Sequence, residues 1–154
     1  MHDVDDVVAQ RLRDSDQRYT PARRALVAAL RSANGPVSIP DIQRLTDDLP
    51  QSSVYRNLSV LESAGVVSRI VGTDEFGRFE LAEDLIGHHH HLLCEECGAM
   101  LDVTVPPEIE AQLDGALEKL AAASGFDLHH HRLDLVGRRS EEHTSELQSP
   151  CNLV

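Results

Sequence analysis

Apolar residues in the first half of the chain recur with the spacing of amphipathic helices. Thr20 followed by Pro21 is a favourable helix start, and turn-forming residues end this helix near residue 34. Ser38 can cap a second helix, and a third is expected from about Ser52 to Gly65. The residues expected to face inward are Leu26, Val27, Leu30, Ile39, Ile42, Leu45, Val54, Leu58 and Leu61. The pattern predicts short helices, the last two joined by a tight turn.

A two-stranded hairpin is predicted directly after these helices. Residues 66–71 (VVSRIV) are β-branched enough to form a strand, and residues 72–77 are rich in turn formers. Residues 78–81 (RFEL) alternate as a returning strand would. Short helices followed by such a hairpin indicate a winged helix-turn-helix.

The third predicted helix carries the residues expected to contact DNA. Its aliphatic side chains share one face, whereas hydroxyl and guanidinium groups point the other way. In a winged helix this helix enters the major groove, and arginines and the wing hold phosphates. The candidate DNA-binding residues are Arg18, Arg23, Ser52, Ser53, Tyr55 and Arg56. A helical protein-interaction module is the alternative, because many small helical domains have one polar helix.

The second half of the chain predicts a small α+β unit. Residues 92–93 and 100–103 flank a cysteine turn as two short strands, and residues 126–136 (FDLHHHRLDLV) alternate as a last strand. Between them, Pro106 and Pro107 open a helix that ends at Ser124 and Gly125. One face of this helix would carry Ile109, Leu113, Leu117 and Leu120. Such a small unit leaves apolar area that a second copy of the chain could cover.

Candidate metal chemistry is concentrated in residues 88–97, which read HHHHLLCEEC. Imidazole nitrogen and thiolate sulfur are ligands that ions such as zinc prefer, and two cysteines separated by two residues can bind one ion from a tight turn. A second histidine cluster, at residues 129–131, strengthens the case. A tag remnant, a solvated loop and a redox-active cysteine pair are the alternatives. Because the run lies inside the chain and next to two leucines, we interpret it as metal-binding.

Composition constrains the setting in which this chemistry works. A chain of 154 residues with a hydrophobic fraction of 41% suits one ordinary domain or two small ones. It contains no segment apolar enough to span a membrane and no signal-peptide pattern, so a cytoplasmic protein with reduced thiols is expected. The net charge of -12 is unusual for a nucleic-acid binder, but six arginines between Arg11 and Arg31 can form a local basic face.

Several motifs in this order resemble the ferric uptake regulator family of bacterial metal-dependent repressors. They are SSVYRNLSVLESAGVV, RFEL, HHHHLLCEECG and GFDLHHHRLDLVG, and the resemblance covers residues 8–138. It implies an α+β chain with an N-terminal winged helix-turn-helix domain (1–84) and a small α/β dimerisation domain (85–138). It further implies a homodimer that binds double-stranded operator DNA and carries metal at the hinge and in the second domain.

The resemblance also implies two regulatory metal sites. The hinge sensor site matches Glu80, His89, His91 and Asp102. The second site matches His88, His90, Glu110 and His131. Many members add a further histidine to the hinge site, where this chain has Pro36. Four ligands are enough for one ion, but the missing one would have tied the DNA-binding domain more firmly to the hinge.

A structural zinc site is implied as well, but only half of it is present. Its first cysteine pair matches Cys94 and Cys97, whereas the second pair, which normally follows the last strand, is absent: position 139 is Arg139 and only Cys151 follows. The polar, acidic residues 139–154 resemble a translated sequencing adapter. We therefore expect a non-native, disordered tail that replaces the true C-terminus. The alternative is a member that dispenses with the second pair.

The expected function is metal-dependent repression, in which metal at the hinge favours the operator-binding dimer. By comparison with the residues that family members carry at these positions, the resemblance implies that Glu80 favours iron(II) as the regulatory metal, followed by zinc, with manganese also considered, whereas Asp102 points toward a peroxide response. Two alternatives belong to other classes. One is a zinc-dependent hydrolase with Glu80 or Asp102 as general base, although the chain has no H-E-x-x-H motif and few aromatic residues. The other is a metal-buffering interaction module that does not bind DNA.

Overall fold

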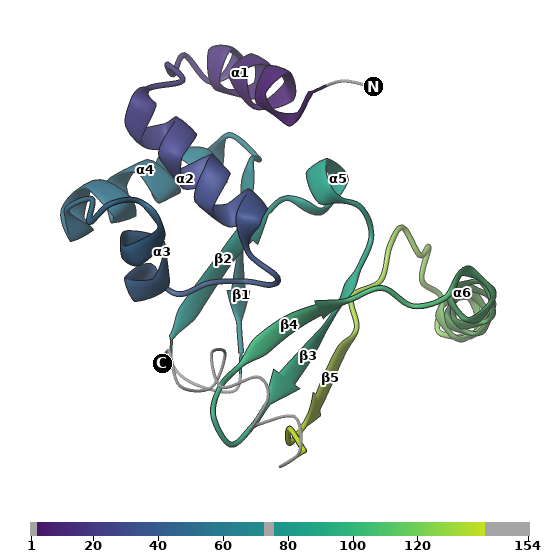
Figure 1. The fold of residues 1–154 in the computed structure, drawn as a ribbon. Coiled ribbons are helices and arrows are strands. Elements are labelled where there is room, and N and C mark those ends of the chain that lie inside the picture. The colour runs from purple at the N-terminus through teal and green to yellow at the C-terminus, as the bar shows by residue number, and fades with distance from the viewer. Residues whose placement is uncertain (1–2, 73–75, 141–154) are drawn as a thin grey trace.

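The chain folds into a helical unit with a two-stranded hairpin, followed by a three-stranded sheet with one long helix (Figure 1). This computed structural model describes residues 3–72 and 76–140. Most of the expected non-native tail, residues 141–154, therefore lies outside the described residues. The first unit contains α1 (Val4–Asp14), α2 (Pro21–Ser32), α3 (Ile39–Leu45), α4 (Gln51–Ser63), β1 (Val67–Val71) and β2 (Gly77–Leu81). The second contains β3 (His90–Cys94), β4 (Met100–Val103), α6 (Pro107–Ala123) and β5 (Asp134–Gly137), with the short α5 (Glu83–Ile86) between the units.

The predicted helix starts are present and are capped by side chains. Thr20 caps α2 by accepting the backbone N–H of Arg23, and Ser38 caps α3 by accepting that of Asp41. α1 was not predicted, although its Val8 and Leu12 are fully buried. One prediction about the core is wrong: Leu45 is exposed rather than inward-facing, because α3 ends at that residue. The other eight predicted inward residues are buried in one core.

The hairpin differs from its predicted pattern on one strand. β1 and β2 pair antiparallel, with Ser68 opposite Glu80. β2 does not alternate between a buried and an exposed face, because Arg78, Phe79, Glu80 and Leu81 are all buried. Phe79 and Leu81 pack into the helical core, whereas Glu80 faces two histidines near the second sheet. β2 is thus covered on both sides, and one of its faces is polar.

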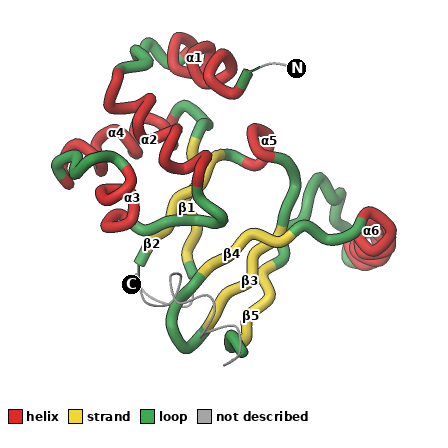
Figure 2. The backbone as a smooth tube through the Cα atoms, viewed as in Figure 1, coloured by secondary structure: helices red, strands yellow, loops and turns green. Residues whose placement is uncertain are grey.

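The second sheet has the order β4-β3-β5 (Figure 2). β3 pairs antiparallel with β4, which places His91 opposite Asp102, and parallel with β5, which places His91 opposite Asp134. A parallel pair needs a long crossover, and α6 lies in the connection between β4 and β5. The last strand is shorter than the predicted 126–136, since β5 begins at Asp134 and ends one residue later, at Gly137. Its side chains are all exposed instead of alternating.

α6 stands to one side of the three-stranded sheet in Figure 1. None of its residues is buried, so the predicted apolar face lacks a covering partner within the described chain. Ile109 and Leu120 on this helix are both more than half exposed. No helix among the described residues has the length and hydrophobicity needed to cross a bilayer. The predicted α+β architecture, with a helical N-terminal unit and a β-containing second unit, is confirmed.

Candidate metal centres and the exposed face of α4

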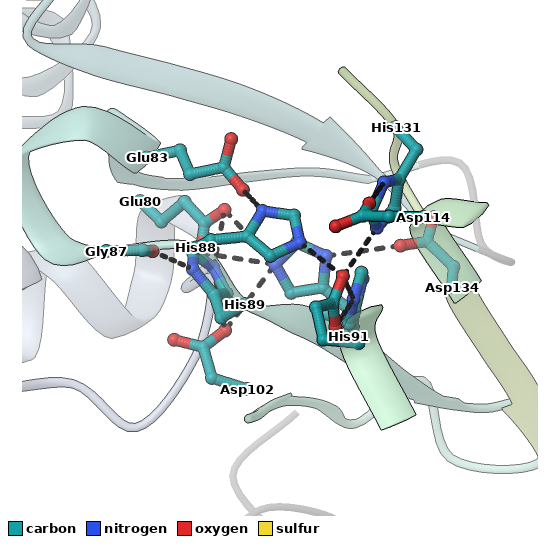
Figure 3. Close-up of polar contacts among 12 residues, drawn as sticks. Glu80, Glu83, Gly87, His88, His89, His91, Asp102, Asp114, His131 and Asp134 are labelled. Atoms are coloured by element: carbon teal, nitrogen blue, oxygen red, sulfur yellow. Dashed lines mark hydrogen bonds and ion pairs between the residues drawn. The ribbon is translucent and has the colours of Figure 1, made fainter. Parts of the chain in front are cut away.

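Two groups of histidines and carboxylates come together around the start of β3 (Figure 3). Successive side chains in an extended backbone point to opposite faces, so the run from His88 to His91 is divided into two pairs. The hinge cluster consists of Glu80, His89, His91 and Asp102. The helix cluster consists of His88, His90, Glu110 and His131. These are the two sets that the sequence predicted as metal sites.

The hinge cluster joins the wing hairpin to the three-stranded sheet. Glu80 lies on β2, whereas His91 and Asp102 face each other across β3 and β4. Nε2 of His89 and Nε2 of His91 each lie 3.1 Å from a carboxylate oxygen of Glu80. The Asp102 Oδ1 atom lies 3.6 Å from the His89 Nε2 and 3.4 Å from the His91 Nε2. Two imidazoles and two carboxylates thus converge on one point.

The carboxylates and imidazoles of the hinge cluster shift one another's pKa values. The hydrogen bond to Glu80 raises the pKa of His91 above its usual range, against the opposing effect of burial. Burial and the negative charge of Glu80 both raise the pKa of Asp102. Burial alone would lower the pKa of His89, but its hydrogen bond to Gly87 and the charges of Glu80 and Asp102 raise it. Without a cation, the site therefore favours bound protons.

The helix cluster is centred on Glu110 of α6. The Nε2 atoms of His88, His90 and His131 lie 3.0, 2.9 and 2.7 Å from its carboxylate oxygens. The Nε2 atom of His131 is buried and contacts this carboxylate directly. Three imidazoles that converge on one carboxylate are a donor set typical of divalent metal ions. The helix cluster therefore fits a metal ion.

The donor sets of both clusters suit a divalent ion. In each cluster the four ligand atoms lie within 4.8 Å of one another. That limit is close to the span of one coordination shell, in which opposite ligands lie about 4.0–4.4 Å apart at metal–ligand distances of about 2.0–2.2 Å. Mixed imidazole and carboxylate donors suit zinc, iron(II) and manganese(II) rather than soft monovalent ions.

Several carboxylates outside the two clusters contact their histidines, and the sequence did not reveal them. Asp134 lies 3.2 Å from Nδ1 of His91, and Asp114 lies 3.1 Å from Nδ1 of His131. Glu83 of α5 contacts Nδ1 of His88 at 2.5 Å. Asp134 stands in the alternating pattern of the predicted last strand, but the order of strands in the sheet decides its neighbour. The sequence therefore indicated a strand that contains Asp134, but not the contact between Asp134 and His91.

The cysteine pair forms a turn after β3. Cys94 is buried and is the free thiol of the two. Its burial would raise the thiol pKa, but backbone N–H groups of Arg139, Cys97 and Glu96 donate to the sulfur and lower it overall. Among residues 3–72 and 76–140, neither cysteine joins a group of three or more metal-type ligands.

The α4 helix presents the predicted DNA-facing residues to solvent. Ser52 and Arg56 are exposed, and Tyr55 is 53% exposed. The half-buried Ser53 accepts a hydrogen bond from Asn57 through its carbonyl oxygen. Arg23 of α2 donates to the side-chain oxygen of Asn57 at 3.0 Å. Asn57, which the sequence analysis missed, therefore fixes α4 to α2.

Arg18 and Arg23 lie on the N-terminal side of α2 and are linked to each other. The Arg23 guanidinium donates to the carbonyl oxygen of Arg18 at 2.7 Å as well as to Asn57. Arg18 is exposed, whereas the contacts of Arg23 give that residue a structural role. The structure thus assigns different environments to the two predicted phosphate contacts.

The segment that contains Pro36 contacts the hinge cluster through its backbone. The N–H of Asp102 donates to the carbonyl oxygen of Asn34 at 3.0 Å. A Cβ placed on Gly35 would lie 2.5 Å from the carbonyl oxygen of Met100. The α2–α3 connection therefore lies against β4 although the histidine found there in many relatives is missing. A winged helix-turn-helix joined in this way to a histidine and carboxylate cluster defines a metal-dependent DNA-binding regulator.

Comparison with known proteins identifies the family of this chain. The chain belongs to the ferric uptake regulator family, whose sequence model matches residues 14–136. It is 32% identical over 141 residues, which is 88% of each chain, to the peroxide-responsive repressor PerR of Staphylococcus aureus (strain USA300). The family prediction is confirmed, and the chain is a metal-dependent transcriptional regulator rather than an enzyme. The hydrolase interpretation is therefore set aside.

Solved structures of family members share the fold. The ferric uptake regulator of Vibrio cholerae is 26% identical, with a TM-score of 0.67 and coverage of 84% of this chain and 98% of that chain. The ferric uptake regulator of Pseudomonas aeruginosa with manganese is 26% identical, with a TM-score of 0.66 and coverage of 88% and 99%. A zinc-bound manganese uptake regulator is 27% identical, with a TM-score of 0.65 and coverage of 86% and 98%.

Proposed function

We propose that this chain represses transcription when a divalent metal is bound by the hinge cluster. The observation that carries this proposal is the convergence of Glu80 from the wing with His89, His91 and Asp102 from the second unit. We place the boundary between the DNA-binding domain (1–84) and the dimerisation domain (85–138) within or next to α5. This short helix lies in the chain between Glu80 and the other three hinge ligands.

The hinge cluster can link metal binding to the arrangement of the two domains. A bound divalent ion supplies positive charge that the four donors share. Glu80 is then attracted toward the second unit, while His89 and His91 lose the protons that their raised pKa values favour. Metal binding stabilises the arrangement in which all four donors meet, and that arrangement is the one with higher affinity for DNA.

The helix cluster is proposed as a second metal site that stabilises the dimerisation domain. All its ligands come from the second unit, because His88 and His90 lie near β3, Glu110 lies on α6 and His131 precedes β5. A metal here would fix α6 relative to the sheet, where the described residues provide no buried contact for that helix. Structural zinc at Cys94 and Cys97 has weaker support, because neither cysteine joins a group of three or more metal-type ligands among the described residues.

The proposed partner is double-stranded operator DNA, bound by a homodimer in the cytoplasm. Ser52, Tyr55 and Arg56 face solvent on α4 and can contact base edges, with Ser53 at the border of the core and Arg18 and Arg23 near the DNA backbone. A second copy of the chain can cover the exposed apolar residues of α6 and β5. Two α4 helices in a symmetric dimer would match two halves of a palindromic operator.

The regulatory metal is proposed to be iron(II), with zinc and manganese as competitors. Two carboxylates and two imidazoles form a harder donor set than a cysteine-containing site would, which favours iron and manganese. A peroxide response is the second candidate function. Its support is the similarity to the peroxide-responsive repressor PerR of S. aureus together with the position of Asp102 beside His89 and His91.

A DNA-binding experiment tests the proposal. An operator is first selected from random duplex DNA with the wild-type chain and Mn²⁺, and its affinity is measured by fluorescence anisotropy with Mn²⁺ and with a chelator. The double variant H89A/H91A should lose the metal-dependent increase in affinity. The matched control is H129A/H130A, which removes two exposed histidines outside both clusters. Metal stimulation that survives in H89A/H91A would refute the assignment of the hinge cluster.

A further inference from the structure

We propose that Asp134 is a positioning residue that orients His91 for metal binding in the hinge cluster. The inference rests on the proposed function of that cluster and adds a residue that lies outside the four ligands. Asp134 belongs to β5, a strand that contributes nothing else to the hinge cluster. Its role would be to hold the imidazole of His91 so that one nitrogen faces the metal.

The His91 ring lies between two carboxylates. Its Nε2 is 3.1 Å from Glu80 Oε1, and its Nδ1 is 3.2 Å from Asp134 Oδ1 (Figure 3). The register of the parallel pair β3 and β5 places His91 directly opposite Asp134. The His91 ring is buried, whereas the Asp134 side chain is about one-third exposed. The geometry is that of a carboxylate behind a metal-facing imidazole.

The chemistry of the two groups fixes the tautomer of metal-bound His91. An ionised carboxylate only accepts hydrogen bonds, so Glu80 at Nε2 and Asp134 at Nδ1 compete for the one proton of neutral His91. When a divalent ion takes the Nε2 lone pair at the point where the four donors converge, the proton must be on Nδ1, where Asp134 accepts it. The negative charge of Asp134 also makes Nε2 a better electron donor. In the other tautomer, the lone pair would point away from the cluster.

Asp134 differs from the groups that orient the neighbouring histidines. The Nδ1–H of His89 donates to the carbonyl oxygen of Gly87 at 2.9 Å, so the other hinge imidazole has a neutral backbone partner. In the helix cluster, Asp114 contacts Nδ1 of His131 at 3.1 Å. Each cluster thus has its own outer aspartate, so a substitution of Asp114 can serve as the control for a substitution of Asp134.

The Asp134 side chain is not needed to hold β5 in place. Backbone pairing joins β5 to β3 over four residue pairs, from His91–Asp134 to Cys94–Gly137. The N–H of Glu95 also donates to the carbonyl oxygen of Gly137 at 2.8 Å, beyond the end of β3. Because this ladder is made by main-chain groups, replacing Asp134 by the isosteric asparagine leaves it intact.

The test is a Co²⁺ titration of the full chain, followed by visible absorption. The double substitution H88A/H90A leaves the helix cluster with only Glu110 and His131, so that the hinge cluster is the remaining four-donor site. In this background, D134N should raise the Kd for Co²⁺ by about 10–100-fold, the usual effect of removing an outer partner. D134E should recover most of the affinity, and D114N should change it by less than about twofold because Asp114 contacts only the helix cluster.

A second measurement separates positioning from a structural role and needs no metal. The ¹⁵N chemical shifts of the His91 ring report its tautomer in the metal-free chain, at a pH high enough for the same shifts to show a neutral ring. Because Glu80 still accepts at Nε2, D134N should move the proton from Nδ1 toward Nε2 relative to wild type. The urea concentration at the midpoint of unfolding should be the same for metal-free D134N and for its metal-free parent.

Each outcome decides between named alternatives. A hinge-site Kd within about twofold of the parent in D134N, or an unchanged tautomer, would overturn the role of Asp134 alone. A weaker site with a lowered urea midpoint, or equal losses in D134N and D114N, would overturn it in favour of a structural role. A parent chain that binds no Co²⁺ at the hinge cluster would overturn both this inference and the proposed function.

Discussion

At the scale of single residues, Glu80 occupies the centre of the hinge cluster, because both His89 and His91 face its carboxylate. It is also the only ligand in that cluster that comes from the wing, since the other three belong to the second unit. Removing its charge therefore affects metal affinity and the link between the units together.

The first prediction concerns Glu80→Gln. The variant should bind Mn²⁺ at the hinge cluster at least about tenfold more weakly, since a neutral amide is a poorer ligand than a carboxylate. Isothermal titration calorimetry measures this, with Glu83→Gln as control, because Glu83 contacts His88 of the other cluster and none of the hinge ligands. Equal losses in both variants would contradict the separation of the two clusters.

A second prediction follows from the raised pKa values of His89 and His91. Because the folded metal-free chain binds these protons more tightly than the unfolded chain, the stabilisation is full below the ordinary histidine pKa of about 6.5. It is lost as pH rises through the higher folded values. Chelator-treated protein should therefore lose stability between about pH 6 and pH 8, as measured by urea unfolding.

Added Mn²⁺ should reverse this trend. The metal needs deprotonated imidazoles, so its affinity and its stabilising effect both increase with pH. The raised pKa of Asp102 acts in the same direction as those of the histidines, but in the acidic range. A chelator-treated chain that is more stable at pH 8 than at pH 6 would show that these histidines do not control the pH dependence.

At the scale of elements, the α2–α3 connection lies tightly against β4. The structure leaves no space for a side chain at Gly35, since its Cβ would overlap the carbonyl oxygen of Met100. The connection also leads directly to α3, which begins at Ile39. A displaced Gly35 would therefore shift the helix-turn-helix relative to Asp102, whose N–H donates to Asn34.

The third prediction is that Gly35→Ala destabilises the chain by about 1–3 kcal/mol, because backbone must move to relieve the overlap. It should also reduce the metal-dependent gain in DNA affinity more than the affinity for metal. Gly115→Ala is the matched control, since nothing lies within 4 Å of its added Cβ and alanine favours the helix. Urea unfolding and anisotropy measure the two effects, and a Gly35→Ala chain as stable as wild type would rule out the tight contact.

The sequence predicted some elements well because their signals are local. Thr20 with Pro21 and Ser38 begin helices through neighbouring backbone groups, so no tertiary information was needed. α1 and the pairing of Asp134 with His91 were missed. The pairing depends on contacts between distant parts of the chain, whereas the signal for α1 is local: Asp3 caps it, and Val4, Val8 and Leu12 recur every four residues. The membership of the two clusters was predicted from alternation and family resemblance, whereas their outer carboxylates depend on strand order.

At the scale of the whole molecule, exposed apolar residues concentrate on α6, β5 and the segment between them. They are Ile109, Leu120, Phe126, Leu128, Leu135 and Val136. A cluster of this kind on a small unit indicates a surface that another chain covers. In the proposed homodimer the second copy provides that cover.

The fourth prediction is that Val136→Asp weakens the dimer. A charge on the covered surface would have to be buried without a partner, which costs several kcal/mol. Analytical ultracentrifugation should show an increase in the monomer fraction. Val71→Asp is the control, because Val71 is equally apolar and exposed but lies on the wing hairpin. A dimer that is unchanged by Val136→Asp would place the interface elsewhere.

The run of four histidines before Leu92 has a consequence for how β3 is aligned. If the strand slipped by one residue, three of the four positions would still hold an imidazole, so the histidines themselves barely distinguish one alignment from the other. The leucines do distinguish the two alignments, because Leu93 is buried and Leu92 is 39% exposed. A slip by one residue would turn each leucine to the opposite face of the sheet. Two leucines, whose side chains bind no metal, thus determine which histidines lie in the hinge cluster and which lie in the helix cluster.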